Sequence, residues 1–297
     1  MHKLGVIPLI NSHRDLSQIS IQYYLNKGSA MPSYRIAEKS LTVAGLISDV
    51  RKLFRLASIL TREQTIRTYI KSQDIRKLQI GSGEVRIPGW LSTDLNPSSR
   101  KVIFLDATKK FPFADNIFDV IYIEHMIEHV NWNEGIFMLR ECRRVLKAGG
   151  VLRVATPDLS TLLEMYCKKN NTRTQKRYIQ WITDEFLEGI KFYKSAFVVN
   201  ALFRSWHHTF LYDGELLETA MREAGFRYIE RVSVGSSKHT ALIGIERHGQ
   251  IINDEEINRF ETMVFEATGT ADRDSIRPQP HLTCTKSSGA RSDPRAA

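Results

Sequence analysis

A glycine turn that follows a short apolar segment restricts most strongly what this chain can fold into. Residues 78–83 read Leu-Gln-Ile-Gly-Ser-Gly, and Asp94 follows eleven residues after Gly83. This order predicts a strand, a tight turn and a second strand that ends in a carboxylate. In an open α/β sheet, ligands bind at the carboxyl ends of the strands, where glycine lets a nucleotide approach the backbone and an acid binds ribose hydroxyls. The segment therefore predicts a site for a nucleotide-like ligand.

The spacing decides against a dinucleotide. That fingerprint needs a third glycine or alanine three residues after the second, and an acid about 20 residues further on. Arg86 stands at the third position, and Asp94 comes too early. A nicotinamide oxidoreductase is therefore disfavoured.

The following segments alternate between short apolar runs and one helical pattern. Apolar runs over residues 102–107, 118–125 and 151–158 are typical of strands that helices cover on both faces. A helix is expected from Trp132 to Leu146, before a Lys-Ala-Gly-Gly turn. This pattern predicts an α/β fold with a mostly parallel sheet.

As an ordered set, these motifs resemble class I S-adenosylmethionine-dependent methyltransferases. The chain is most similar to a small bacterial group of the type 11-like kind, which combines a Gly-Trp pair (89–90), a Glu-His pair (124–125) and an Ile-Glu-Arg-His segment (245–248). The resemblance covers about residues 76–266. It implies a Rossmann-like, seven-stranded, mostly parallel sheet with a terminal antiparallel strand, helices on both faces, an N-terminal helical extension and a helical insertion after strand five.

The chain departs from this family at two positions of the first motif. Gln79 stands where the family usually carries an acid, and Val85 stands where it often has a third glycine. Both changes concern the contact to the methionine end of the cofactor. An amide can still accept a hydrogen bond there.

The resemblance implies S-adenosylmethionine as the cofactor and a set of residues that bind it. Gly81, Ser82 and Gly83 would line the methionine and ribose, Asp94 would accept hydrogen bonds from the ribose hydroxyls, and Asp106 would take the adenine amino group. The remaining positions that it implies for cofactor binding are Leu95, Ala107, Glu124 and His125.

Histidines near the expected crevice are the candidates for catalysis. An oxygen acceptor needs a base with a pKa near neutral, which histidine usually supplies. We expect His129, and after it His208, to be the catalytic base. Trp206, His207 and Tyr212 are expected to bind the acceptor, which we take to be a small molecule or a cell-envelope glycan or lipid-linked compound that is O-methylated.

An aromatic-rich segment over residues 158–212 is expected to cover this acceptor. It holds 11 of the 28 aromatic residues of the chain. The alternative is that these aromatic side chains form an ordinary core of their own.

Two other classes of function stay open. Residues 125–129 read His-Met-Ile-Glu-His, the pattern of inverted zinc peptidases. That chemistry needs the motif within a helix and a third ligand from elsewhere, whereas here it begins where a strand ends, and we assign no metal ligand. A non-catalytic module that binds S-adenosylmethionine is the other alternative, favoured by the departures at Gln79 and Val85.

The distribution of charge makes a nucleic-acid substrate less favoured. The net charge of +9 divides into +6 over residues 1–75, +1 over residues 76–270 and +2 over residues 271–297. A groove that follows a phosphate backbone needs positive charge near the chemistry. The nearly neutral central part does not provide it.

Further features favour a soluble, cytoplasmic protein. Cys142, Cys167 and Cys284 have neither metal nor disulfide spacing. The first ten residues are too short and too interrupted for a signal peptide, and no run of about 18 apolar residues occurs.

The ends of the chain are expected to differ from its centre. Residues 1–75 form an extension that is irregular over residues 1–40 and helical from Val43 to Leu60, and a capping box at residues 61–64 starts a second helix. The first helix is basic and amphipathic, so it either packs over the fold or touches an anionic membrane or a partner. Residues 267–297 are expected to be disordered.

After the insertion, the sheet is expected to resume within the methyltransferase domain of residues 76–266. Asp213 should cap a helix that runs through Ala224, with Gly225 after its end. Residues 226–234 and 241–246 are expected to pair as the final antiparallel strands.

Overall fold

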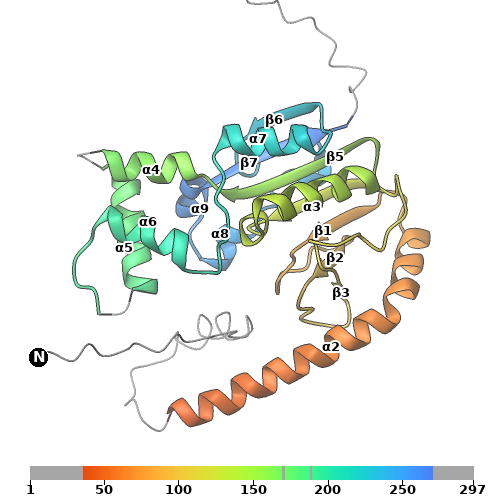
Figure 1. Cartoon of the computed structure of the whole chain (residues 1–297), viewed down its shortest axis with the longest axis horizontal. Coiled ribbons are helices and arrows are strands. Elements are labelled where there is room, and N and C mark those ends of the chain that lie inside the picture. The colour runs from red at the N-terminus through yellow and green to blue at the C-terminus, as the bar shows by residue number, and fades with distance from the viewer. Residues whose placement is uncertain (1–35, 169–170, 188, 270–297) are drawn as a thin grey trace, which may run out of the picture.

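A seven-stranded sheet organises the part of the chain that the computed structural model describes, residues 36–168, 171–187 and 189–269. The expectations for residues 1–35 and 270–297 lie outside these residues. The strand order is β3-β2-β1-β4-β5-β7-β6 (Figure 1). The strands are β1 (Lys77–Ile80), β2 (Leu91–Asp94), β3 (Ile103–Phe104), β4 (Phe118–Glu124), β5 (Leu146–Pro157), β6 (Tyr228–Val232) and β7 (Thr262–Thr268).

Most of the sheet is parallel, as expected. β1 pairs in parallel with β2 and β4, β2 with β3, and β4 with β5. β7 lies antiparallel between β5 and β6. This order and direction confirm the mostly parallel, seven-stranded α/β fold with an antiparallel terminal strand.

The identity of the last strand was predicted wrongly. Residues 241–246 do not form a strand; η2 (Thr240–Leu242) and a turn at residues 243–244 occupy most of this stretch, and β7 begins only at Thr262. The segment instead places Leu242 and Ile245 on the sheet, in a cluster with Trp90 and Tyr122. At this place η2 and the residues that follow it cover that face of the sheet.

Two amphipathic helices cover the opposite face of the sheet. They are α3 (Trp132–Val145) and α7 (Gly214–Glu223), which pack Met138, Leu139 and Leu217 into the main core. Local signals begin both: Asn131 forms a capping box with Glu134, and the Asp213 carboxylate accepts the Leu216 N–H. α7 ends at Glu223, and Gly225, two residues further on, has φ of 94°, which confirms its expected place after the helix.

One long helix, α2 (Ile36–Ser72), precedes the sheet and runs along its β3 edge (Figure 1). Two expectations were wrong here, because residues 36–40 are already helical and Thr61 starts no second helix. The Thr61 hydroxyl donates to the Ala57 carbonyl of the preceding turn, as serine and threonine do inside helices. The helix contacts the domain through Ser58, Ile66 and Tyr69.

The outer face of α2 carries apolar side chains in solvent. Leu53, Leu56 and Leu60 are 65%, 59% and 85% exposed. These three side chains therefore lie away from the domain, whereas Ser58, in the same segment of residues 43–60, bonds to it. Among the described residues, no helix combines the length and apolarity needed to cross a bilayer.

The segment after β5 folds into three helices with a core of its own. They are α4 (Leu159–Cys167), α5 (Arg173–Phe186) and α6 (Ser195–Arg204). Tyr178, Ile179 and Leu202 belong to this second core, together with Ile257 from α9 (Glu255–Glu261). α9 follows α8 (His248–Ile251) and leads directly into β7. The helical insertion after strand five is thus present.

Candidate active site

The glycine turn after β1 has the conformation that its sequence predicts. Gly81 and Gly83 have φ values of 71° and 52°, which residues with a side chain rarely adopt. A Cβ at Gly81 would lie 2.5 Å from Cγ of Met126, whereas nothing lies within 4 Å of the equivalent position at Gly83. The turn is therefore packed on one side and open on the other.

Asp94 lies against this turn from the end of β2. Its Oδ2 accepts the Gly83 N–H at 2.8 Å, and its Oδ1 accepts the Asn96 N–H at 2.7 Å. Leu95, which follows it, is 39% exposed. The carboxylate and the glycine turn thus form one unit.

Asp106 and Ala107 follow β3 at the same edge of the sheet. Asp106 accepts hydrogen bonds from the backbone N–H and the hydroxyl of Thr108, and an ion pair joins it to Lys109 at 3.0 Å. Burial raises the pKa of this carboxyl, but these partners outweigh burial and lower it overall. Asp106 is therefore an ionised acceptor beside the buried Ala107.

Gln79, one of the two departures from the family pattern, holds the glycine loop from within. Its amide nitrogen donates to the Val85 carbonyl at 2.9 Å, and its amide oxygen accepts the Ser92 hydroxyl at 2.9 Å. The side chain is almost completely buried. Gln79 thus connects β1, the loop and β2.

Glu124 and His125 end β4, next to the glycine turn. The Glu124 carboxylate accepts the backbone N–H groups of Arg247 at 2.8 Å and His248 at 2.9 Å. Glu124 is therefore engaged in positioning the start of α8. His125 adopts φ of 44°, and its Nε2 lies 3.1 Å from Oγ1 of Thr262.

A buried glutamate connects the predicted catalytic histidines. Glu128, in the short helix η1 (Ile127–His129), has no exposed side-chain surface and accepts the Thr156 hydroxyl at 2.9 Å. Potential ligand atoms of Glu128, His129 and His208 lie within 4.8 Å of one another. Burial raises the pKa of Glu128, but the hydrogen bond to His125 and the nearby His129 and His208 lower it to about 2.

The two candidate bases differ in their surroundings. Their rings meet edge to face, with centroids 5.2 Å apart. His129 is exposed. His208 is half-buried, a Leu202 carbonyl lies 2.9 Å from its Nδ1, and burial lowers its pKa. The tertiary structure therefore unites two histidines that are 79 residues apart in the sequence.

The three predicted acceptor-binding residues lie in different environments. Trp206 and His207 both have positive φ, and the Trp206 ring contacts Phe186 and lies 5.6 Å from the His208 ring. His207 is exposed. Tyr212 has no exposed surface and packs in the main core, so its side chain cannot line an open acceptor site in this conformation.

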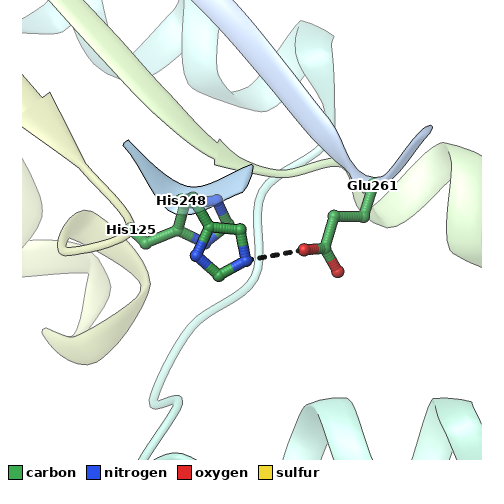
Figure 2. A group of neighbouring side chains, drawn as sticks. All are labelled: His125, His248 and Glu261. Atoms are coloured by element: carbon green, nitrogen blue, oxygen red, sulfur yellow. Dashed lines mark hydrogen bonds and ion pairs between the residues drawn. The ribbon is translucent and has the colours of Figure 1, made fainter. Parts of the chain in front are cut away.

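Sequence reasoning missed two residues at this edge, His248 and Glu261. His248 stacks on His125 with ring centroids 3.9 Å apart, and its Nε2 lies 2.8 Å from Oε1 of Glu261 (Figure 2). His248 belonged to the Ile-Glu-Arg-His segment, which was a usable signal. Nothing in the sequence around Glu261 indicated a role at this site, because Glu261 reaches this edge of the sheet only through the position of β7, which follows it.

The residues at the glycine turn fit a nucleoside-containing cofactor. Gly83 faces open space, and the buried Ser82 hydroxyl has no hydrogen-bond partner among the described residues. Asp94 and Asp106 add acceptors at neighbouring strand ends. These features are what the ribose and adenine of such a cofactor require.

Comparisons with known proteins point to the same class. Residues 78–154 match the family model described as a methyltransferase domain. This segment contains the glycine turn, both aspartates and Glu128. No curated protein matches the chain.

Among solved structures, the chain is similar to a SAM-dependent methyltransferase from Archaeoglobus fulgidus, at 18% identity over 72% of this chain and 94% of that chain, with a TM-score of 0.38. It is also similar to a possible histamine N-methyltransferase from Thermotoga maritima, at 17% identity over 75% and 95% of the two chains, with a TM-score of 0.38. At these identities and TM-scores, the similarities do not identify an acceptor.

The methyltransferase-domain match over residues 78–154 and the strand order support the class I S-adenosylmethionine-dependent methyltransferases, which the motif series predicted. S-adenosylmethionine is the cofactor of this enzyme class. The alternative of an inverted zinc peptidase is not supported, because residues 125–129 do not lie on one helix: His125 has φ of 44° and only residues 127–129 are helical.

Proposed function

We propose that this methyltransferase O-methylates a hydroxyl group of a small molecule or of a cell-envelope glycan or lipid-linked compound. The observation that carries the proposal is that the carboxyl ends of parallel β1, β2 and β4 meet at one edge. There Asp94 accepts the Gly83 N–H, and His129 and His208 lie beside Glu128. A glycine turn that can hold the cofactor lies at the same edge of the sheet as two histidines that can accept a proton. This arrangement suits methyl transfer to a hydroxyl oxygen, because a base must remove the hydroxyl proton.

The residues that would hold the cofactor are those of the turn and the neighbouring strand ends. Gly81, Ser82 and Gly83 would contact the methionine and ribose, and Asp94 would accept hydrogen bonds from the ribose hydroxyls. Asp106 would accept the adenine amino group. Leu95, Ala107, Glu124 and His125 complete this proposed set, although Glu124 also holds the backbone of residues 247–248.

When bound, S-adenosylmethionine supplies an electrophilic methyl group on a positively charged sulfur. The chain's own task is to align the acceptor and exclude water, since a well-oriented reaction avoids much of the entropic cost. His129 would remove the hydroxyl proton, with His208 as the second candidate. Trp206 and His207, next to His208, would border the acceptor.

The first test measures cofactor affinity. Asp94→Ala removes charge-assisted hydrogen bonds, each of which contributes about 1.5–3 kcal/mol. Calorimetry should therefore show S-adenosylmethionine binding weakened by roughly 10- to 100-fold for each bond that is lost. Asp74→Ala, an exposed aspartate on the loop before β1, is the matched control. Thermal unfolding of both variants shows whether the turn still folds. Unchanged affinity in a folded Asp94→Ala protein would remove Asp94 from the site.

The second test concerns the base. His129→Ala should lower turnover by roughly 10² to 10⁴, the usual range for general acid–base catalysis, and leave cofactor affinity intact. Near-normal turnover on a hydroxyl acceptor would transfer the role to His208, whose alanine variant is then measured. If turnover falls only slightly in both, the acceptor is a nucleophile that needs no base, such as a neutral amine.

The acceptor itself is found by mass spectrometry. Extracts of small molecules and of cell-envelope glycans or lipids, incubated with the enzyme and S-adenosylmethionine, should contain a product heavier by about 14 mass units. If no extract yields a methylated product although the cofactor binds, the non-catalytic binding module becomes the better description.

Contact with a membrane surface through residues 43–60 and a cytoplasmic location belong to the same proposal. The exposed Leu53, Leu56 and Leu60, in a segment with basic neighbours, support peripheral contact with anionic lipid. Sedimentation with anionic vesicles at low salt tests it. Equal sedimentation of the wild type and a Leu56→Ser, Leu60→Ser double variant would speak against such contact.

A further inference from the structure

Three side chains with metal-binding atoms converge at the carboxyl edge of the sheet. His125 follows β4, His248 begins α8, and Glu261 ends α9, so the three come from separate parts of the chain. One potential ligand atom from each lies within 4.8 Å of the others. Figure 2 shows the two imidazole rings face to face, with His248 directed at the Glu261 carboxylate.

Each of these side chains is held in place by neighbouring groups. The backbone of His125 is in the left-handed region, at φ of 44°, and its N–H donates to the Ala155 carbonyl. The backbone N–H of His248 donates to Glu124 at 2.9 Å. Glu261 accepts the hydroxyl of the buried Tyr178 at 2.6 Å. The cluster is thus built into the fold.

His125 has the environment of a metal-binding histidine. Its Nδ1 lies 3.3 Å from Oε1 of Glu128, a carboxylate with no exposed surface. Histidines that bind metals usually donate one ring N–H to a carboxylate and coordinate through the other nitrogen. The other nitrogen, Nε2, faces Thr262 at 3.1 Å, on the residue next to Glu261.

We propose that His125, His248 and Glu261 bind one divalent transition-metal ion, of which zinc is the best match to two imidazoles and a carboxylate. Tetrahedral coordination at about 2.0–2.2 Å would place the ligand atoms roughly 3.3 Å apart. The imidazole planes of His125 and His248 now lie 22° apart in a stack, so one ring must rotate before nitrogens of both face a single ion.

The exposure of the cluster suits a site with an open coordination position. The side chains of His125 and His248 are 16% and 20% exposed, while that of Glu261 is 6% exposed. Catalytic zinc sites combine three protein ligands with a fourth position for water or substrate.

A role for this ion rests on the proposed function. A hydroxyl that occupies the open position would lose its proton more readily, because a divalent cation lowers the pKa of a bound oxygen acid. The methyl group would then form its bond to that oxygen as its bond to the sulfur of S-adenosylmethionine breaks and S-adenosylhomocysteine leaves. The hydroxyl proton would pass to a neighbouring base such as His129. The metal site would thus select hydroxyl-bearing acceptors.

The test uses the full-length chain after chelation and dialysis. Titration with Co²⁺ should give a visible absorption band at one ion per chain, and calorimetry with Zn²⁺ should give the same stoichiometry. His248→Ala and Glu261→Gln should each weaken binding by more than about 100-fold, since even loss of an outer partner costs 10- to 100-fold. Glu128→Gln changes only the outer partner of His125, so it should weaken metal binding by about 10- to 100-fold.

Two control variants locate the ion. His239→Ala, outside the cluster, should bind the metal like the wild type. His129→Ala tests the neighbouring group of Glu128, His129 and His208: if it abolishes binding while His248→Ala does not, the proposed site is wrong. Circular dichroism confirms folding, and Glu261→Gln keeps the shape of the side chain if His248→Ala fails to fold. No metal binding by the folded wild type overturns the proposal.

Calorimetry with S-adenosylmethionine on the same samples separates this inference from the proposed function. Cofactor binding without metal binding would leave the methyltransferase proposal standing and reject the metal site. Metal binding with methyl transfer only to acceptors without hydroxyl groups would reject the proposed O-methylation and keep the site.

Discussion

At the scale of single residues, Gln79 shows how a departure from a family pattern can be structural. Its amide satisfies the Val85 carbonyl and the Ser92 hydroxyl in a buried environment. Gln79→Leu would leave both without this partner, which should lower the free energy of unfolding by about 1–3 kcal/mol. Urea denaturation followed by circular dichroism measures this change.

The same variant should also weaken cofactor binding, because the glycine loop loses its internal support. The exposed Gln64→Leu is the matched control and should alter neither quantity. If Gln79→Leu were as stable as the wild type, the amide would not be what holds the loop.

Arg153 presents a stronger case of a buried polar residue. Its side chain is fully buried on β5, where its guanidinium pairs with Glu246 and Glu266 and donates to the Ser236 carbonyl. Arg153→Met would leave two buried carboxylates without a cation and should cost about 3–5 kcal/mol of stability. Urea denaturation checks this value.

A triple variant with Glu246→Gln and Glu266→Gln provides the comparison for Arg153→Met. It removes the uncompensated charges and should recover part of the loss. A single Arg153→Met variant with wild-type stability would show that the network contributes nothing.

At the scale of elements, the Ser58 hydroxyl joins α2 to the β3 edge of the sheet, while the Tyr69 hydroxyl joins it to β1. Ser58 Oγ accepts the Phe104 N–H at 2.6 Å and donates to the Val102 carbonyl at 3.3 Å, across the β3 edge. Ser58→Ala should therefore lower the free energy of unfolding by about 1–3 kcal/mol. Leu60→Ser, on the exposed face of the same helix, should stay within about 0.5 kcal/mol of the wild type. Chemical denaturation of the two variants measures these changes. An equal loss of stability in Ser58→Ala and Leu60→Ser would mean that the outer face of α2 is covered in solution.

At the scale of the whole molecule, two separate cores predict two levels of stability. The central strands β4 and β5 belong to the main core, whereas α5 and α6 pack around a smaller core of their own. Native-state hydrogen exchange should therefore show α5 and α6 opening at lower free energy than β4 and β5. Ile179→Ala should increase this difference, because it removes a buried side chain from the smaller core. Equal protection of both regions would mean that they unfold as one unit.

Short sequence segments were sufficient to predict the structure wherever neighbouring residues determine it. Gly81 and Gly83 adopt the positive φ that their turn needs, and Asp213 and Gly225 delimit α7 as expected. The order of the glycine turn and Asp94 predicted a strand before the turn and a second strand that ends at Asp94, as β1 and β2 do. These features, together with the fold class, could be predicted from the sequence because each depends on a short segment.

Only the tertiary structure decided the features that depend on distant partners. Thr61 lies within one continuous helix because the chain on both sides of it is helical, so its capping signal is not used. β7 lies at residues 262–268 and not at residues 241–246, because strand pairing depends on which sheet edge is available. That placement also brings Glu261 and His248 to His125, more than 120 residues away in sequence. The sequence alone determined the strand ends and turns of the cofactor site, whereas the cluster beside it exists only because the antiparallel strand returns to the same edge of the sheet.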